Sequence, residues 1–458
     1  MSYADYITDL SARFWEKVRF PNKFTREVVW GIVLGITVSL SSTSAALIVQ
    51  DWRRKRAMRR IPPRPIELRS DEIVPGTIGL IGNTPLMRIN SLSDALGVEI
   101  LGKAEFLNPG GSVKDRVALQ IIEDAEASGL LHPHTGSVLF EGTVGSTGIS
   151  LATVGKAKGY ECCIIMPDDV AIEKVQALEK LGAIVERVRP ASIVDEKQFN
   201  LARKRALEFG QTELTNAPAH GNAVAVSTLA APSEVEHDNF LPSSLEHKPR
   251  GFFADQFENE SNYLAHYKGT GPEILRQSSG NLDAFVSGAV GTGGTIAGTG
   301  CFLKKALPNL TIALSDPEGS GLFNKVRYNV MFDMKEREGT KRRHQVDTVV
   351  EGIGINRITH NFSLGLPVID DAFRISDVEA VAMSRYLVQH DGLFLGSSSA
   401  CNLVACVRLA KTLKKGARIA TILCDSGARH QSKFWSDDYL KEHNIPIDTT
   451  IIDTLLIT

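Results

Sequence analysis

The stretch "EFLNPGGSVKDRVA" (residues 105–118) places one lysine, Lys114, between a Gly-Gly-Ser turn and an Asp-Arg pair. Directly after the lysine, "DRVALQIIEDAEASG" (115–129) predicts a helix, because its apolar residues recur on overlapping turns and Gly129 ends the pattern. Lys114 therefore stands where a loop becomes a helix. An ordinary surface lysine does not need such a setting, whereas a reactive lysine does.

Short apolar runs alternate with helical patterns on both sides of this stretch. Such alternation predicts an α/β fold with parallel sheets and right-handed crossovers. Two further helices are expected at 148–159 and 171–182. The expected strands are 98–105, 137–142, 161–167, 183–188, 282–290, 311–317, 349–354 and 418–427.

The composition is that of an ordinary globular protein and argues against several other classes. The chain has 458 residues, 43% of them hydrophobic and 23% charged, as in an ordinary globular protein. Its formal net charge of −2 gives no indication of a nucleic-acid surface. The six cysteines form no C-x-x-C pair, which argues against a disulfide framework or a structural zinc site and favours a reducing compartment.

The first 65 residues differ from the rest. Residues 28–50 carry no charge, and about 20 apolar residues suffice to span a bilayer as a helix. Six basic residues follow between Arg53 and Arg60, so the positive-inside rule keeps the C-terminal part in the cytosol. A presequence or a soluble helix is the alternative to this membrane anchor. "IPPRP" (61–65) then predicts a linker.

Two segments interrupt the alternation of strands and helices. Residues 217–250 are rich in proline, serine and charge, and they predict an inserted excursion or a mobile loop. Residues 327–345 predict a surface insertion.

Two glycine-threonine loops are candidates for binding anions. In "SGAVGTGGTIAGTG" (287–300) a strand leads into glycines and then a helix, so backbone N–H groups can cradle a phosphate where a side chain would exclude it. "EGTVGSTGIS" (141–150) has the same form. The first loop also fits a dinucleotide-binding unit, with Asp316 as the ribose ligand. Its glycine-fingerprint positions would be Gly291, Gly293 and Ala297.

Two anion cradles and a lysine together favour a different chemistry. A dehydrogenase does not require the second cradle. A pyridoxal-phosphate enzyme acting on an amino acid needs one cradle for the cofactor phosphate and one for the substrate carboxylate. It also needs a lysine to hold the cofactor as a Schiff base. Lys114 is the candidate.

The chain resembles the cysteine synthase and cystathionine β-synthase family, which has the two-lobed fold type II of pyridoxal-phosphate enzymes. The resemblance covers residues 73–435 and extends to fungal membrane-anchored cysteine synthase-like proteins. Its motifs occur in the family's order: "IGNTPLMRIN" (81–90), "NPGGSVKDR" (108–116), "TGPEI" (270–274), "GTGGTIAG" (291–298), "EGIG" (351–354) and "DSGARHQS" (425–432).

The resemblance implies a role for each motif. Lys114 would bind pyridoxal 5′-phosphate and move the substrate's Cα proton, and Ser398 in "GSSSA" (396–400) would hydrogen-bond the pyridine nitrogen. The cofactor phosphate would be held by Gly291, Thr292, Gly293, Gly294 and Thr295. The substrate carboxylate would be held by Thr143, Val144, Gly145 and Thr147.

Three positions depart from the family pattern. Ser146 replaces the asparagine that bonds the cofactor's phenolic oxygen, and a serine hydroxyl can still donate but reaches less far. Val144 replaces a serine, which removes a hydroxyl near the substrate carboxylate. His430 stands where a tyrosine is common, and we interpret it as a packed or surface histidine.

The expected activity is β-replacement, in which O-acetyl-L-serine and sulfide give L-cysteine. An L-cysteine desulfhydrase and an inactive membrane-tethered scaffold are the alternatives, and no metal is expected. The expected organisation is an anchor and linker at 1–65, a catalytic domain at 73–435 and a tail at 436–458. The resemblance further implies a homodimer at the mitochondrial outer membrane, with the catalytic part facing the cytosol.

Overall fold

The computed structural model describes residues 73–188, 199–209, 211–216, 223–228, 248–288, 291–331 and 348–457, together with Trp30 and Gly31. Nearly all of the uncharged segment 28–50, the linker 61–65 and most of the two irregular segments lie outside these ranges. Within them, no helix combines the length and the apolar character that crossing a membrane requires.

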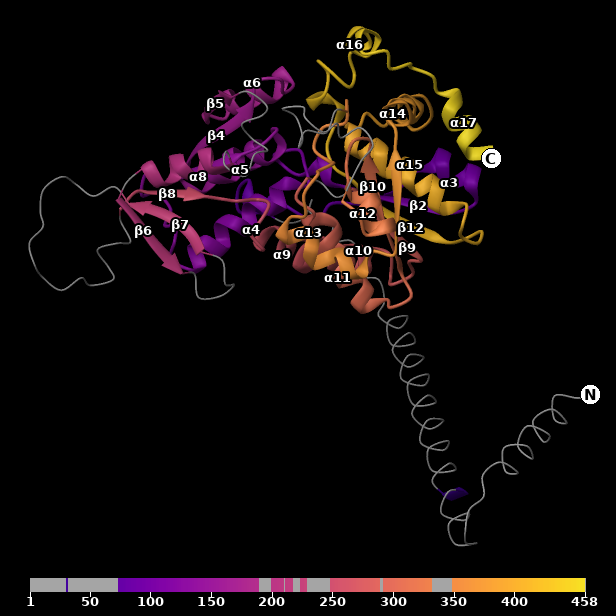
Figure 1. Cartoon of the computed structure of the whole chain (residues 1–458), viewed down its shortest axis with the longest axis horizontal. Coiled ribbons are helices and arrows are strands. Elements are labelled where there is room, and N and C mark those ends of the chain that lie inside the picture. The colour runs from indigo at the N-terminus through magenta and orange to yellow at the C-terminus, as the bar shows by residue number, and fades with distance from the viewer. Residues whose placement is uncertain are drawn as a thin grey trace, which may run out of the picture. The chain divides into compact units, whose positions relative to one another are not determined.

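Two six-stranded sheets organise the described part of the chain (Figure 1). The first has the order β5-β4-β3-β8-β7-β6, and its strands β5, β4, β3 and β8 are parallel while β7 and β6 are antiparallel. Its strands are β3 (Val138–Gly142), β4 (Glu161–Pro167), β5 (Ile184–Val188), β6 (Gln211–Asn216), β7 (Ala223–Thr228) and β8 (Arg250–Phe253).

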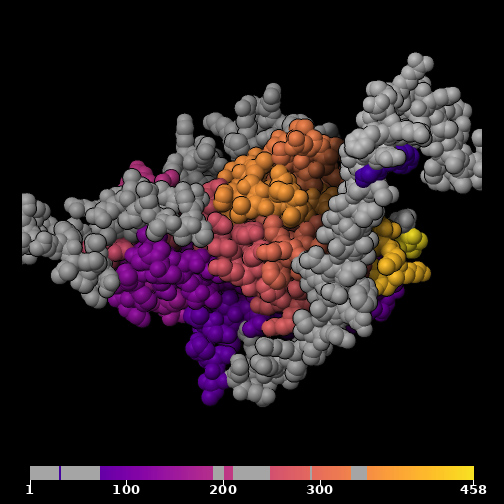
Figure 2. All heavy atoms as spheres, turned by 90° about the horizontal axis from the view of Figure 1, so that it is seen from below, coloured from indigo at the N-terminus to yellow at the C-terminus, as the bar shows by residue number. Residues whose placement is uncertain are grey.

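The second sheet has the order β1-β2-β12-β9-β10-β11 and is parallel except for β1. Its strands are β1 (Leu86–Arg88), β2 (Glu99–Ala104), β9 (Ala284–Gly288), β10 (Thr311–Pro317), β11 (Asp371–Ile375) and β12 (Arg418–Leu423). We call each sheet with its covering helices a lobe, the first lobe and the second lobe. Figure 2 shows purple residues of the first lobe beside orange residues of the second.

Helices cover both faces of the second sheet, because side chains of a strand alternate between its faces. On β9, Val286 packs into the core that α15 (Ser397–Ala410) fills, while Phe285 packs into the core of α11 (Gly294–Ala306). The remaining helices of this lobe are α3 (Asn90–Leu96), α10 (Gly271–Gln277), α12 (Leu322–Tyr328), α13 (His360–Gly365), α14 (Asp377–Asp391), α16 (Asp437–Glu442) and α17 (Thr450–Ile457).

The first sheet is covered in the same way. Leu139 and Ile164 pack with the helices of one face, whereas Phe140 and Ile165 pack with α8 (Phe199–Glu208) on the other. The helices of the first face are α4 (Lys114–Ala127), α5 (Ser146–Lys158) and α6 (Ile172–Lys180), and α9 (Ser261–Ala265) packs against α4.

Most of the expected elements are confirmed, and two are wrong. The run 349–354 forms no strand, because Gly352 and Gly354 have φ of +90° and +93°, outside extended geometry. The segment 217–250 is more than a loop: its alternating run at β7 pairs with β6 and β8. The prolines and charges on either side of β7 obscured this short strand.

Candidate active site

Lys114 is the first residue of α4, and only 3% of its surface is exposed. Its Nζ donates a hydrogen bond to Oγ1 of Thr292, 3.2 Å away. Burial lowers the pKa of Lys114 to about 8, against the opposing influence of Cys424 and Glu141. A substantial fraction of this amine is therefore neutral and nucleophilic near pH 8, as the sequence predicts for a reactive lysine.

The turn before Lys114 is fixed from both lobes. Gly111 has φ of +80°, a left-handed conformation that favours glycine. The amide of Val113 donates to the carbonyl of Cys424 at 3.0 Å, which ties the turn to the end of β12. Asp115 accepts from the amide of Gly110 and from the hydroxyl of Ser150 on α5. These bonds hold the lysine in place independently of its own side chain.

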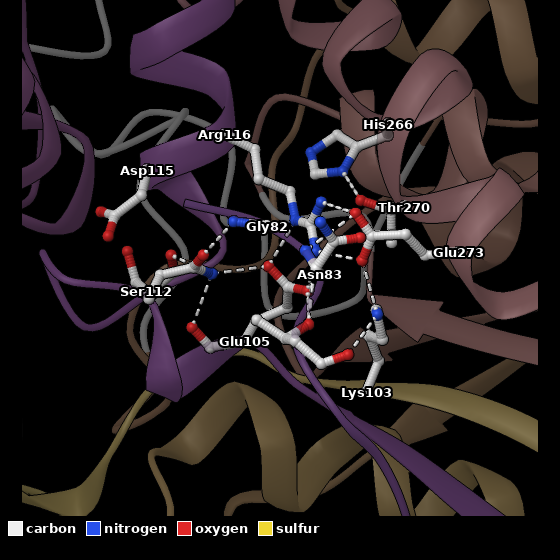
Figure 3. A network of polar contacts seen from close by, with 12 residues as sticks. Gly82, Asn83, Lys103, Glu105, Ser112, Asp115, Arg116, His266, Thr270 and Glu273 are labelled. Carbon is white, nitrogen blue, oxygen red and sulfur yellow. Dashed lines mark hydrogen bonds and ion pairs between the residues drawn. The ribbon is translucent and has the colours of Figure 1, made fainter. Parts of the chain in front are cut away.

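A buried charge network joins Arg116 of α4 to the second lobe (Figure 3). Arg116 donates both to Glu105 and to Glu273, with N–O distances of 2.7–2.8 Å. Lys103, which is fully buried, donates to the second oxygen of Glu273 at 2.6 Å. We call these four residues the buried quartet. Its two positive and two negative charges balance, so their burial does not leave an isolated ion.

Both lobes line a cavity of about 270 Å³ around the lysine. Of the residues singled out in the sequence, the lining contains Lys114, Thr143, Val144, Ser146, Thr147, Gly291, Thr292, Ser398 and His430. Gly145, Gly293, Gly294 and Thr295 are not among the lining residues. The two glycine-threonine loops and the lysine thus come together, although 178 residues separate Lys114 from Thr292.

The loop before α11 contains glycines for two different reasons. A Cβ on Gly291 would meet only Phe257, at 3.9 Å, so that residue lies open to the cavity. A Cβ on Gly293 would lie 2.4–2.8 Å from Phe362, and one on Gly294 would lie 2.1 Å from Asn262. The expectation that a side chain would exclude the anion therefore does not account for Gly293 and Gly294, whose small size allows close packing. The first amides of α11 have no intrahelical acceptors and favour an anion.

The second loop leads into α5 and is braced by a residue that the sequence did not single out. Thr147 donates to Oε1 of Gln256 at 2.5 Å, and Nε2 of Gln256 donates to the carbonyl of Gly142. The amide of Gln256 in turn donates to Glu141 at the end of β3. Burial, reinforced by the charge of Asp255, raises the pKa of Glu141 to about 8. Gln256 lies 109 positions from Thr147 in the chain, so only the fold brings it to this loop.

The three serines that open α15 have different partners. Ser397 accepts from the amide of Glu351 at 3.1 Å, and Ser399 accepts from the amide of Cys424 at 2.8 Å. Ser398 alone of the three lines the cavity. Burial raises the pKa of the Cys424 thiol to about 12, although a hydrogen bond with Ser398 opposes this shift. Ser398 is thus the serine placed to meet a ligand.

His430 is packed, as interpreted from the sequence, and it also faces the cavity. It is 2% exposed, and its Nε2 lies 3.0 Å from Oδ2 of Asp425. Its Nδ1 lies 3.7 Å from Oε2 of Glu351. Glu351 pairs in addition with Lys174 of α6 and with Lys433. No motif pointed to Lys174, because an ordinary helix pattern surrounds it.

The dinucleotide interpretation is not supported by the position of Asp316. Its Oδ2 accepts from the amide of Phe323, and the residue does not line the cavity. The cavity instead offers a buried amine of lowered pKa, a helix N-terminus beside an open glycine, and a hydroxyl on its far wall. These donors fit a phosphate-bearing aldehyde with a ring nitrogen, as pyridoxal phosphate is.

Comparison with known proteins agrees with this chemistry. Residues 78–425 match the family model described as "Pyridoxal-phosphate dependent enzyme". The chain is 55% identical over 386 residues to "Cysteine synthase 2" of Emericella nidulans, covering 84% of each chain. It is 48% identical to "Putative mitochondrial cysteine synthase" of Saccharomyces cerevisiae, covering 85% of this chain and 89% of the relative.

A solved structure is similar as well. The O-acetylserine dependent cystathionine beta-synthase from Helicobacter pylori is 28% identical, with a TM-score of 0.60. The match covers 79% of this chain and 98% of that one.

Proposed function

The chain belongs to the family of pyridoxal-phosphate-dependent enzymes, and from this membership we propose that it makes L-cysteine from O-acetyl-L-serine and sulfide. The cofactor is pyridoxal 5′-phosphate and the reaction is a β-replacement. The relatives named cysteine synthase, at 48–56% identity, support this activity. The observation that carries it is the single cavity in which Lys114 meets both glycine-threonine loops and Ser398.

Each part of the cavity has a proposed task toward the cofactor. Lys114 binds it covalently, and the hydroxyl of Ser398 contacts its ring nitrogen. Ser146, at the start of α5, contacts its phenolic oxygen. The cofactor phosphate is held by Gly291, Thr292, Gly293, Gly294 and Thr295, of which the last three act through the backbone of the first turn of α11.

The substrate is held at the N-terminus of α5. Its carboxylate is bound by the loop of Thr143, Val144, Gly145 and Thr147, which we call the substrate loop. Support comes from the place of this loop beside Lys114 and from the α5 amides that have no intrahelical acceptors. Gln256 keeps the loop in register through Thr147.

The cofactor supplies an electron sink that makes the substrate's Cα proton acidic. Lys114 takes that proton and later returns it. A pKa of about 8 suits an amine to both tasks, because the neutral and protonated forms are both populated near neutral pH. A serine at the ring nitrogen cannot protonate the ring as a carboxylate would, which limits the sink and favours elimination at Cβ.

The proposal is tested with the purified full-length protein. Its visible absorption is recorded while O-acetylserine and then sulfide are added, and cysteine is measured. We expect O-acetylserine to change the absorption and sulfide to reverse the change. The amount of cysteine formed should equal the amount of sulfide consumed.

Other outcomes would point elsewhere. A yellow protein that ignores O-acetylserine and releases sulfide from cysteine would be a desulfhydrase. A colourless protein that does not take up pyridoxal phosphate would be the membrane-tethered scaffold.

We also propose that residues 1–65 form a membrane anchor and linker, ahead of the catalytic domain at 73–435 and the tail at 436–458. The uncharged run and the basic cluster after it support the anchor, with the catalytic part in the cytosol. The Saccharomyces cerevisiae relative named "Putative mitochondrial cysteine synthase" supports a mitochondrial location. The outer membrane is proposed from the resemblance to fungal membrane-anchored proteins of the family. Alkaline extraction and protease treatment of intact mitochondria test this placement: the protein should stay in the pellet and its catalytic part should be digested.

A homodimer is proposed from the resemblance to the family. Light scattering of the detergent-solubilised protein tests it, with twice the chain mass expected after subtraction of detergent.

A further inference from the structure

Two neighbouring residues of α6, in the first lobe, contact the second lobe through their side chains. Lys174, only 2% exposed, makes an ion pair with Oε2 of Glu351. Glu173 accepts a hydrogen bond from the amide of Ser432 at 2.9 Å. Lys174 and Glu351 both line the cavity, so this pair stands on the wall where the lobes meet.

The stem of Lys174 lies directly on the substrate loop. A Cβ built on Gly145 would lie 2.6 Å from Cδ of Lys174 and 3.2 Å from its Cβ. Gly145 also has φ of +131°, a conformation that L side chains rarely adopt. Glycine at this position therefore lets the stem of Lys174 lie over the loop. Because Lys174 belongs to α6, a movement of α6 would also move this side chain.

Glu351 is held in the second lobe near two segments that are proposed to bind the cofactor. Its amide donates to Ser397, the neighbour of Ser398, and the carbonyl of Gly352 accepts from Gly291 at 3.1 Å. Burial alone would raise the pKa of Glu351, but Lys174, His430 and Lys433 lower it to about 2. Its carboxylate is therefore ionised throughout the neutral range.

Separation of the pair would affect its two residues differently, because, among the described residues, only Glu351 has other charged side chains paired with it. If α6 moved away, Glu351 would keep Lys433, 3.4 Å from its other oxygen, and His430. Lys174 would lose the only anion that the structure pairs with it among the described residues, and it would leave for solvent with its helix. The ion pair therefore holds Lys174 in this position more than it holds Glu351.

We propose that Lys174 and Glu351 are a positioning pair that latches the substrate loop against the cavity when the lobes close. The inference rests on the proposed role of this loop in binding the amino-acid substrate. Neither residue takes part in bond breaking. The pair determines how long the loop stays in its binding geometry.

Two single variants and their combinations test the latch. Lys174→Met keeps the stem over Gly145 and removes the charge, and Glu351→Gln keeps the shape of its partner. The first readout is amide hydrogen exchange of the substrate loop in the holoenzyme without substrate. We expect either variant to speed exchange by about tenfold, within the range of coupling between contacting residues. The double variant should be no faster than either single one.

The second readout is steady-state kinetics. The KM for O-acetylserine should rise about tenfold while kcat changes less than twofold, because the chemical groups are untouched. The exchanged pair Lys174→Glu with Glu351→Lys should recover part of the exchange protection. Lys180→Met makes the same chemical change at an exposed position of α6 and should alter neither readout.

The outcomes separate the latch from the proposed activity. Unchanged exchange in both single variants, or effects that simply add in the double variant, would overturn the latch. If Lys174→Met does not fold, Glu351→Gln and the exchanged pair decide by the same criterion. Faster exchange in an enzyme that ignores O-acetylserine would keep the latch and reject the synthase.

Discussion

Nζ of Lys114 lies 3.2 Å from the hydroxyl of Thr292, although the two residues are 178 positions apart. The lysine opens the first helix of the first lobe, and the threonine belongs to the loop before α11 in the second. The amine that is proposed to bind the cofactor and the loop that is proposed to hold its phosphate are thus brought together only by the packing of the lobes.

Lys114→Ala should abolish covalent attachment of the cofactor and lower cysteine formation by at least about 10²-fold, because it removes the proton carrier. Borohydride reduction followed by peptide mapping measures the attachment. Lys156→Ala, at an exposed lysine of α5, is the control and should retain both the label and the activity. A labelled Lys114→Ala protein would show that another lysine holds the cofactor.

Uptake of pyridoxal phosphate by the apoenzyme should speed up as pH rises toward about 8 and then level off. The pKa of Lys114 is lowered to about 8, and only the neutral amine, which dominates above that pH, attacks an aldehyde. The rate of recovery of the visible absorption measures this. Glu141 and Cys424 raise the pKa of Lys114 against the effect of burial, so Glu141→Gln should move the midpoint to lower pH. A rate that is flat between pH 6 and 9 would contradict the assignment.

Thr147→Val should raise the KM for O-acetylserine by about tenfold, because it leaves the buried Oε1 of Gln256 without its donor. The kcat should change less. Thr153→Val serves as the matched control, since its hydroxyl bonds only a carbonyl one turn back in the same helix. Equal kinetics for the two variants would mean that Gln256 does not brace the loop.

Glu105→Gln should lower the free energy of unfolding of the holoenzyme by about 3–5 kcal/mol, because it breaks a buried ion pair and leaves Arg116 incompletely compensated. Lys156→Ala breaks the exposed pair with Glu161 and should cost less than about 1 kcal/mol. Urea titration at fixed cofactor concentration measures both. A loss as small as that of the exposed pair would show that the buried quartet does not stabilise the fold.

The buried quartet also predicts how stability depends on acid. Burial would raise the pKa of Glu273, but Arg116 and Lys103 lower it to about 2, whereas an ordinary glutamate titrates near 4.5. The stabilisation by Glu273 should be complete above about pH 4.5 and should be lost as pH falls from there toward 2. Glu273→Gln should flatten this part of the stability profile, as measured by urea titrations at successive pH values. An unchanged slope would place the acid sensitivity elsewhere.

The sequence predicted the strands of both lobes well where apolar runs are long, as at β4 and β10. The prediction failed where glycine backbone geometry or strand pairing determines the secondary structure. The run 349–354 looks like a strand, but positive φ at Gly352 and Gly354 turns it into a loop along the cavity. The strand β7 was hidden inside a segment rich in proline, serine and charge, and its pairing with β6 and β8 became visible only in the fold.

The chemistry of the site was readable because local motifs carry it. Lys114, the two glycine-threonine loops and Ser398 each lie beside a helix start, and a helix N-terminus has its properties wherever it is placed. The residues that were missed act at a distance. Lys174 sits in an ordinary helix pattern, and Glu351 belongs to a quoted motif that gave it no partner. Gln256 and Lys174 acquire their partners only when two lobes or two loops meet.

By itself, the sequence determined the class of fold and the cofactor and gave Lys114 as the candidate lysine, because hydrophobic periodicity and glycine-rich turns are properties of short segments. Tertiary structure alone decided which of three serines faces the cavity, why Gly293 and Gly294 must be small, and that the stem of Lys174 packs against Gly145 while its amine pairs with Glu351. The reason is physical: burial, charge pairing and close packing depend on atoms that are far apart in the chain and become neighbours only after folding.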